Sequence, residues 1–132
     1  MKLEGGCQCG AVRYSVEGQP QHVALCHCAD CQKSSGAPTV AWAAYAAGEF
    51  AVTAGKPSSY SSNGDAVRHF CPTCGSGLYY VNEAVLPGLA DIQVVTLDDP
   101  GALQPQAQIQ VAERVGWMKD AASLPEFERY PG

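Results

Sequence analysis

Short runs of apolar and β-branched residues, separated by Gly, Pro and Asn, recur along most of this chain. Residues 11–16 alternate apolar and polar side chains with the period of two that is typical of a half-buried strand. By the same criteria, further strands are expected over residues 22–25, 39–46, 50–53, 58–61, 67–70, 78–81 and 91–97. The pattern predicts a mainly β fold with little helix.

Turn signals connect these runs. Residues 3–17 are expected to form a hairpin, and Asn63-Gly64-Asp65 is a hairpin turn signal. One helical turn is expected over residues 30–35, ended by Gly36 and Pro38. Residues 108–111 are expected to be extended and the last twenty residues to be rich in loops. The aromatic residues Trp42, Tyr45 and Phe50 are expected in the core rather than in a pocket.

Length and composition fit one globular domain over residues 1–132. The formal net charge of −5 repels phosphate backbones and argues against nucleic-acid binding. No apolar run reaches the length of a membrane span, and the N-terminus has no signal-peptide core. We therefore expect a cytoplasmic protein whose thiols stay reduced.

Seven cysteines in three clusters are the main candidates for chemistry in this chain. They occur as Cys7-Gln-Cys9, Cys26-His-Cys28-Ala-Asp-Cys31 and Cys71-Pro-Thr-Cys74. An odd number of closely spaced cysteines in a reducing compartment favours metal ligation over disulfides. Four thiolates close one tetrahedral zinc site, and the remaining three leave a second zinc with a free position. The count predicts two Zn²⁺ per chain.

The outer pairs are expected to form the closed, structural zinc site. A Cys-x-x-Cys turn such as Cys71–Cys74 directs two sulfurs at one ion and requires two more ligands. Cys7 and Cys9 can supply them because the neighbouring glycines let the backbone bend. The site would then join segments that are more than sixty residues apart in the sequence.

The central cluster is expected to hold a zinc with an open position. Cys26, Cys28 and Cys31 lie within six residues, so one compact loop can place all three sulfurs on one face of a metal. Soft thiolate ligands suit the capture of an incoming thiol. Three alternatives remain at this point: a second structural site completed by a histidine, a redox-active set of thiols, or an iron–sulfur cluster. The histidines that could complete such a site are His22, His27 and His69.

Further candidates for chemistry flank these clusters. Lys33, Arg68 and His69 could bind anionic groups of a substrate. The simpler interpretations are a solvated Lys33, a cross-strand salt bridge of Arg68, and a sheet position or supporting hydrogen bond for His69. Candidate proton donors, from proximity in sequence only, are His27, Asp30 and Tyr60.

At the cysteine clusters the chain resembles the family of the glutathione-dependent formaldehyde-activating enzyme, which also includes centromere protein V-like proteins. The matching pieces are residues 6–10, residues 26–38 from Cys26 to Pro38, residues 55–60, and residues 68–78 around Cys71 and Cys74. The resemblance implies an Mss4-like β-sheet fold. It also implies that Cys7, Cys9, Cys71 and Cys74 hold structural zinc and that Cys26, Cys28 and Cys31 hold catalytic zinc.

The resemblance further implies a carbon–sulfur lyase that acts on a thiol–aldehyde adduct such as S-hydroxymethylglutathione. The expected partner is then a small thiol such as glutathione, with Lys33 and Arg68 as substrate-binding residues. Two alternatives are a non-enzymatic zinc module that binds a protein partner and a redox-sensing thiol protein. The oligomeric state is left open.

Overall fold

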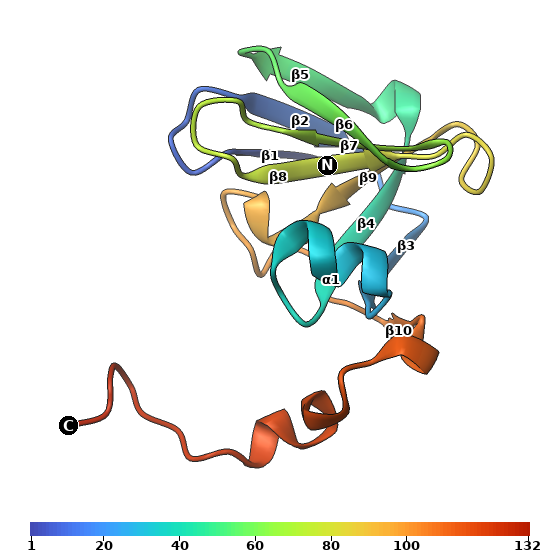
Figure 1. The fold of residues 1–132 in the computed structure, drawn as a ribbon. Helices are drawn as coiled ribbons and strands as arrows, with labels where there is room; N and C mark the ends of the chain where they lie inside the picture. The colour runs from blue at the N-terminus through green and yellow to red at the C-terminus, as the bar shows by residue number, and fades with distance from the viewer.

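Ten strands form two sheets in the computed structural model, which describes all 132 residues (Figure 1). The smaller sheet has the order β1-β2-β5 and the larger one β10-β3-β4-β9-β8-β7-β6. The strands are β1 (Lys2–Gly6), β2 (Arg13–Glu17), β3 (His22–Cys26), β4 (Val40–Ala46), β5 (Phe50–Ala54), β6 (Ser58–Asn63), β7 (Ala66–Phe70), β8 (Gly77–Val81), β9 (Leu89–Gln93) and β10 (Ala107–Ile109). Neighbouring strands are antiparallel except β10, which runs parallel to β3. The predicted mainly β fold is confirmed.

One α-helix, α1 (Ala29–Ser35), lies beside the larger sheet (Figure 1). Its start is capped by the Cys28 sulfur, which accepts a hydrogen bond from the backbone N–H of Cys31. Its end is formed by Gly36, whose φ of 69° is the left-handed conformation that commonly ends helices. Short 3₁₀ helices span Ala47–Glu49, Val94–Thr96, Val111–Glu113 and Gly116–Ser123.

Two predicted strands have different bounds in the structure. The strand expected over residues 91–97 is β9, which begins at Leu89 and ends at Gln93. The chain then turns, because the Thr96 hydroxyl donates to the Gln93 carbonyl at 2.7 Å. The extended segment expected over residues 108–111 is β10, which ends at Ile109. Gln110 follows with a φ of 56°, so the backbone leaves the strand conformation there.

The main hydrophobic core lies between the two sheets and contains the fully buried Tyr45. Tyr14 from the small sheet and Ile92 from the large one belong to the same cluster. Trp42 points to the other face of β4, where it packs with Cys26 and the other buried members of a second, smaller cluster. Alternation along β4 therefore places Tyr45 in the main core and Trp42 on the face of the sheet that carries α1.

The C-terminal segment leaves the body of the protein after β10 (Figure 1). Trp117, Leu124, Phe127 and Tyr130 are more than half exposed along it. This agrees with the expectation of a loop-rich end, apart from the 3₁₀ helix Gly116–Ser123. None of the helices combines the length and the apolar character that crossing a membrane requires.

Gly5 lies where the small sheet meets the turn after β9. An isolated bridge pairs Gly5 with Leu97, and the Tyr14 hydroxyl is 2.7 Å from the Thr96 hydroxyl at the same place. A Cβ atom on Gly5 would stand 2.6 Å from both the Thr96 carbonyl oxygen and the Tyr14 hydroxyl. The absence of a side chain therefore permits the close approach of the two segments.

We expect Gly5→Ala to lower the free energy of unfolding by about 1–3 kcal/mol, because the added methyl group overpacks this junction. Gly116→Ala is the matched control, since a Cβ atom there meets no atom within 4 Å. Urea denaturation of the two variants and of the unsubstituted protein measures the difference. Equal stability of the two variants would contradict this account of the junction.

Candidate metal centres and the adjoining cavity

The first cysteine group joins two loops that follow strands of different sheets. Cys7 and Cys9 follow β1 in the small sheet, and Cys71 and Cys74 follow β7 in the large sheet. The four sulfurs lie within 4.8 Å of one another. Cys7 and Cys71 are buried, Cys74 is half-buried and Cys9 is exposed. The structure thus brings together the four residues predicted to form the closed site.

The sulfur positions in this group fit a tetrahedral metal. Cys7 and Cys9 have sulfurs 3.6 Å apart, and those of Cys9 and Cys71 are 3.8 Å apart. Zinc–sulfur bonds of about 2.3 Å in a tetrahedron place sulfurs about 3.8 Å apart. The N–H of Val12 points at the Cys7 sulfur from 3.2 Å, and the N–H of Cys74 at the Cys71 sulfur from 3.5 Å. Backbone donors of this kind stabilise thiolate ligands.

The second group, Cys26, Cys28 and Cys31, lies where β3 passes into α1, and we call these three cysteines the triad. Cys26 is the last residue of β3, Cys28 caps the helix, and Cys31 is in its first turn. All three sulfurs lie within 4.8 Å of one another, with 3.7 Å between those of Cys26 and Cys31. The donor set and its spacing fit a zinc with three thiolate ligands.

The pKa values of two triad thiols, Cys26 and Cys31, are shifted in opposite directions. The Cys31 thiol donates to Cys26, which lowers the pKa of Cys26 and raises that of Cys31; burial adds to the rise at Cys31. In the first group, hydrogen bonding to Ser76 lowers the pKa of Cys74 to about 5. Thiolates crowded in a low-dielectric setting repel one another, and a divalent cation between them relieves that repulsion.

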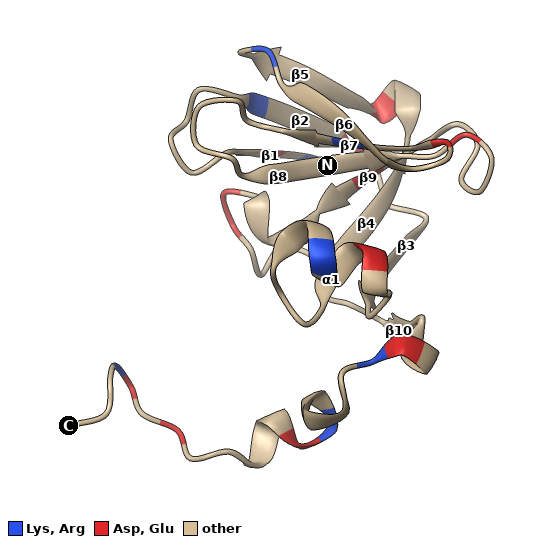
Figure 2. Ribbon diagram, in the orientation of Figure 1, with Lys and Arg blue, Asp and Glu red and all other residues tan.

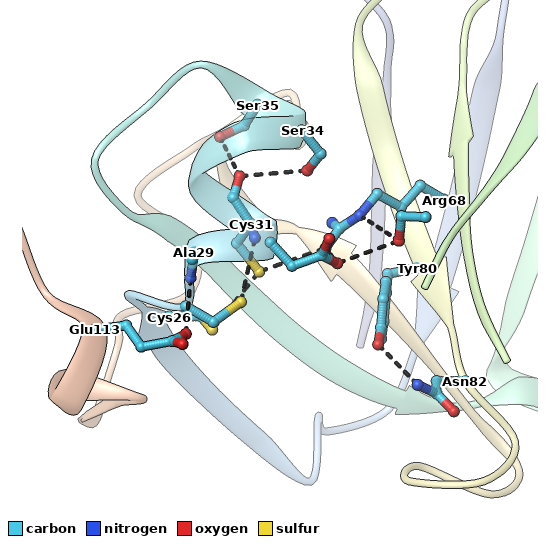
Figure 3. A network of polar contacts seen from close by, with 12 residues as sticks. Cys26, Ala29, Cys31, Ser34, Ser35, Arg68, Tyr80, Asn82 and Glu113 are labelled. Carbon is cyan, nitrogen blue, oxygen red and sulfur yellow. Dashed lines mark hydrogen bonds and ion pairs between the residues drawn. The ribbon is translucent and has the colours of Figure 1, made fainter. Parts of the chain in front are cut away.

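Arg68 is the cation nearest the triad. Its guanidinium lies 3.7 Å from the Cys31 sulfur and forms an ion pair with Asp30 at 2.7 Å (Figure 3). It also lies over the Tyr80 ring, 5.0 Å from the ring centroid. The partner of Arg68 is therefore an acidic residue on α1, and the cross-strand salt bridge that the sequence suggested is wrong. This ion pair joins β7 to the helix that carries Cys31.

The histidines lie outside the triad's ligand cluster. His27 is buried and points away, with its Nε2 atom 2.9 Å from Oε1 of Gln108. His69 stacks on Tyr79 with ring centroids 4.2 Å apart, and burial lowers its pKa. His22 is at the other end of β3 from Cys26. The structure therefore gives the triad no fourth protein ligand among these residues.

A cavity of about 720 Å³ opens beside the triad. Its lining contains the three cysteines, Asp30, Arg68, Trp42 and Tyr80. Lys33 is exposed on another side of α1 and lines a separate hollow with Trp117. Tyr60 lies in a third hollow, which shares Trp42 and Arg68 with the main cavity. Arg68, but not Lys33, is therefore placed to reach a molecule bound at the triad.

Four contributions to the site escaped the sequence analysis. Glu113 accepts a hydrogen bond from the N–H of Ala29 at 2.8 Å (Figure 3). The side chain of Gln108 is hydrogen-bonded to His27. Trp42, expected only in the core, lines the cavity, and Asp91 lies in the cavity wall. No local motif marks these residues, because strand pairing brings them to the site from positions remote in sequence. Gln108 and Glu113 reach the site because β10 pairs with β3 in parallel, and this pairing cannot be predicted from the sequence alone.

Charged side chains are dispersed over the fold. Lys and Arg number 8 against 13 Asp and Glu, and Figure 2 shows them scattered rather than gathered in one basic face. A nucleic-acid surface normally needs clustered cations.

Comparison with known proteins identifies the family of this chain and a solved structure with the same fold. A family model described as "Glutathione-dependent formaldehyde-activating enzyme" matches residues 2–113. A Halomonas elongata protein named "Putative glutathione-dependent formaldehyde-activating enzyme" is 34% identical over 87 residues, which are 60% of this chain and 55% of that protein. The match thus spans about half the length of this relative. A crystal structure of a Rhodobacter sphaeroides protein shares the fold, with a TM-score of 0.63 and 22% identity over 80% of this chain and 99% of that one.

Removing one sulfur from each group should have different consequences. We expect Cys71→Ser to release one zinc and lower the midpoint of thermal unfolding on the order of 10 °C or more, because it opens the site that joins the two sheets. Cys28→Ser should also release one zinc but lower the midpoint by less, since the triad lies within one local segment. Zinc per chain by elemental analysis and thermal unfolding measure both. Equal losses of stability would contradict the division into structural and open sites.

Proposed function

This chain belongs to the family of the glutathione-dependent formaldehyde-activating enzyme, and we propose that it is a zinc enzyme that forms or cleaves the carbon–sulfur bond of a thiol–aldehyde adduct. The adduct we favour is S-hydroxymethylglutathione. The observation that carries the proposal is the incomplete set of three sulfurs at the wall of a cavity large enough for a small molecule.

The metal would be held by Cys26, Cys28 and Cys31. A Zn²⁺ at the triad would supply a positive charge that favours the thiolate form of an entering thiol. A zinc that already has three thiolate ligands would favour a further sulfur ligand, because soft donors suit one another. The second, four-sulfur group is complete and would support the fold rather than the reaction.

The reaction balances without an oxidant or reductant. In the forming direction, the thiol sulfur bonds to the aldehyde carbon, the carbonyl π bond breaks, and the thiol proton ends on the former aldehyde oxygen. Cleavage reverses each change. Negative charge develops on the oxygen as the sulfur attacks, so a positioned cation beside it lowers the barrier.

Arg68 is the residue we assign to that charge. Its side chain is largely buried, and Asp30 and Tyr80 fix its position from two sides. A buried guanidinium with a fixed orientation is a better stabiliser of an oxyanion than a mobile, solvated lysine. Among the proton donors considered from the sequence, His27 is engaged by Gln108 and Asp30 by Arg68, which leaves the transfer to solvent within the cavity or to Tyr60 from the adjoining hollow.

Two further pairs of residues form the walls around the triad. Trp42 and Tyr80 pack with their ring centroids 5.7 Å apart at the base of the triad. Glu113 and Gln108, on the segment that follows β9, cover the start of α1 and His27. A bound substrate would displace water from this cavity and so strengthen the interaction between Arg68 and a developing negative charge.

Cobalt substitution tests the open position directly. We expect glutathione to change the visible ligand-field bands of the Co²⁺-loaded protein, because the thiol would add a fourth sulfur at the triad. Cys28→Ser protein loaded with Co²⁺ at the other site is the control and should not respond. If no small thiol alters the spectrum of the intact protein, the lyase proposal fails and a protein-binding zinc module becomes the better explanation.

Two substitutions that each remove one positive charge test the role of Arg68. We expect Arg68→Gln to lower kcat/KM for S-hydroxymethylglutathione formation or cleavage by about 10-fold or more, because the oxyanion loses its charged partner. Lys33→Gln should leave it within about twofold, since Lys33 lies outside the cavity. NMR of the formaldehyde–glutathione exchange supplies the rates. Equal effects of both substitutions would argue for a general field effect instead.

A further inference from the structure

The wall of the triad's cavity contains one carboxyl group that the metal chemistry does not use. Asp91 on β9 is 7% exposed and lines this cavity. Its Oδ1 atom is buried and has no hydrogen-bond partner. The two ion pairs of the protein, Arg13 with Asp98 and Arg68 with Asp30, do not include it. A carboxyl group in such surroundings lacks a cation or donor that would compensate its burial.

The immediate neighbours of Asp91 are already engaged or apolar. On the β8 side, the Tyr80 hydroxyl accepts a hydrogen bond from the Asn82 side chain at 2.9 Å. The Asn82 oxygen in turn accepts from the N–H groups of Ala84 and Val85. On the β4 side, the residue paired with Asp91 is Ala44, which has no polar side-chain atom. His22, which pairs with Ala44 in the next strand, also lines the cavity but makes no hydrogen bond or ion pair with Asp91. A ligand in the cavity can therefore supply the partner that Oδ1 of Asp91 lacks.

Burial has a clear effect on this group. Removing the carboxylate from water raises the pKa of Asp91 to about 7. The group therefore carries a proton for part of the time near neutral pH. An entering cation would favour the charged form and make the pair with it.

Strand register places Asp91 at a defined position relative to the triad. One continuous row across the large sheet runs His22, Ala44, Asp91, Tyr80, Arg68. Along a strand, side chains two residues apart share a face, so Trp42 and Val40 lie on the same face as Ala44. Cys26 pairs with Val40, four residues further along β4. Asp91 and the triad therefore face the same side of one sheet, at two ends of the cavity.

The separation of the two ends follows from sheet geometry. Four residues along a strand and two strand spacings correspond to about 16 Å between the Cα atoms of Cys26 and Asp91. Side chains that reach about 3 Å toward each other leave a gap between about 10 and 16 Å. In glutathione the sulfur is on the central cysteine, and the extended γ-glutamyl arm from that sulfur to the ammonium nitrogen spans about 9–10 Å. A molecule of that size can place its sulfur at the triad and its far end near Asp91.

We propose that Asp91 binds the ammonium group of the thiol substrate at the end of the cavity remote from the triad. The inference rests on the proposed function, since it assigns the second end of the molecule whose sulfur would bind there. In glutathione the γ-glutamyl residue carries the free ammonium group at the opposite end from the carboxyl-terminal glycine. Asp91 is then a specificity-determining residue that favours γ-glutamyl thiols over thiols without a cation.

The opposite placement of charges in the cavity supports this assignment. Arg68 stands next to the triad, where negative charge develops, and Asp91 stands at the other end, where no protein cation meets it. A substrate that develops negative charge at its reacting end and carries an ammonium group at its remote end can meet Arg68 and Asp91 at the same time. A thiol without the ammonium group would leave the buried carboxyl group uncompensated.

Ligands without a free thiol separate this inference from the metal chemistry. We would measure calorimetric binding of S-methylglutathione and of N-acetyl-S-methylglutathione to the zinc-loaded protein. The intact protein should bind S-methylglutathione about 10-fold or more tightly than the acetylated compound, because a charge-assisted hydrogen bond is lost on acetylation. Asp91→Asn should bind the two compounds with equal affinity. Asp120→Asn removes the same charge from an exposed position and should behave as the intact protein does.

Each other outcome overturns the proposal. Equal binding of both compounds by the intact protein would show that the ammonium group is not recognised, and so would absence of binding by S-methylglutathione. A preference that survives in Asp91→Asn would assign the ammonium group to another residue. None of these results affects the cobalt test of the open metal position. Conversely, if the cobalt test fails, the binding of S-methylglutathione still shows whether Asp91 recognises the ammonium group.

Discussion

The convergence of four sulfurs from the ends of two distant strands is the constraint on which the rest of this structure depends. Cys7 and Cys9 come from the small sheet, and Cys71 and Cys74 from the large one. A metal held there would fix the end of β7 against the first hairpin. Arg68 lies on β7 three residues before Cys71, so the same constraint fixes the cation that faces the triad. Through this strand, a metal at the four-sulfur group would also support the arrangement of the triad.

The two cysteine groups differ in what surrounds them rather than in their sulfur spacing. Both show sulfur–sulfur distances close to those of a tetrahedral zinc site. The first group is complete and sits in turns whose amides point at the sulfurs. The triad is one ligand short and lies at the wall of a cavity with a guanidinium beside it. The chemistry proposed for the triad would therefore depend as much on the cavity as on the metal.

Much of the fold could be predicted because it depends on local signals. The strand pattern, the turn at Gly64 and the helix end at Gly36 each arise from a few neighbouring residues. The end of β9 escaped prediction because Val94–Thr96 is a β-forming sequence that a hydrogen bond from Thr96 turns away from the strand. At the site, Lys33 and Arg68 were indistinguishable in sequence, as both flank a cysteine cluster. Only the fold shows that Arg68 faces the cavity, whereas Lys33 lines a separate hollow.

The sequence by itself identified the three cysteine clusters, because cysteines two or three residues apart can direct their sulfurs at one point, and the structure then joined the two outer pairs into one group. It also determined the β character of the chain through the period of its apolar residues. The tertiary structure alone decided which side chains surround the triad. Arg68, Trp42, Asp91 and Glu113 come from different strands or segments, and pairing in the large sheet brings them to one cavity. Such neighbours are set by register between distant strands, a long-range property that no local pattern encodes.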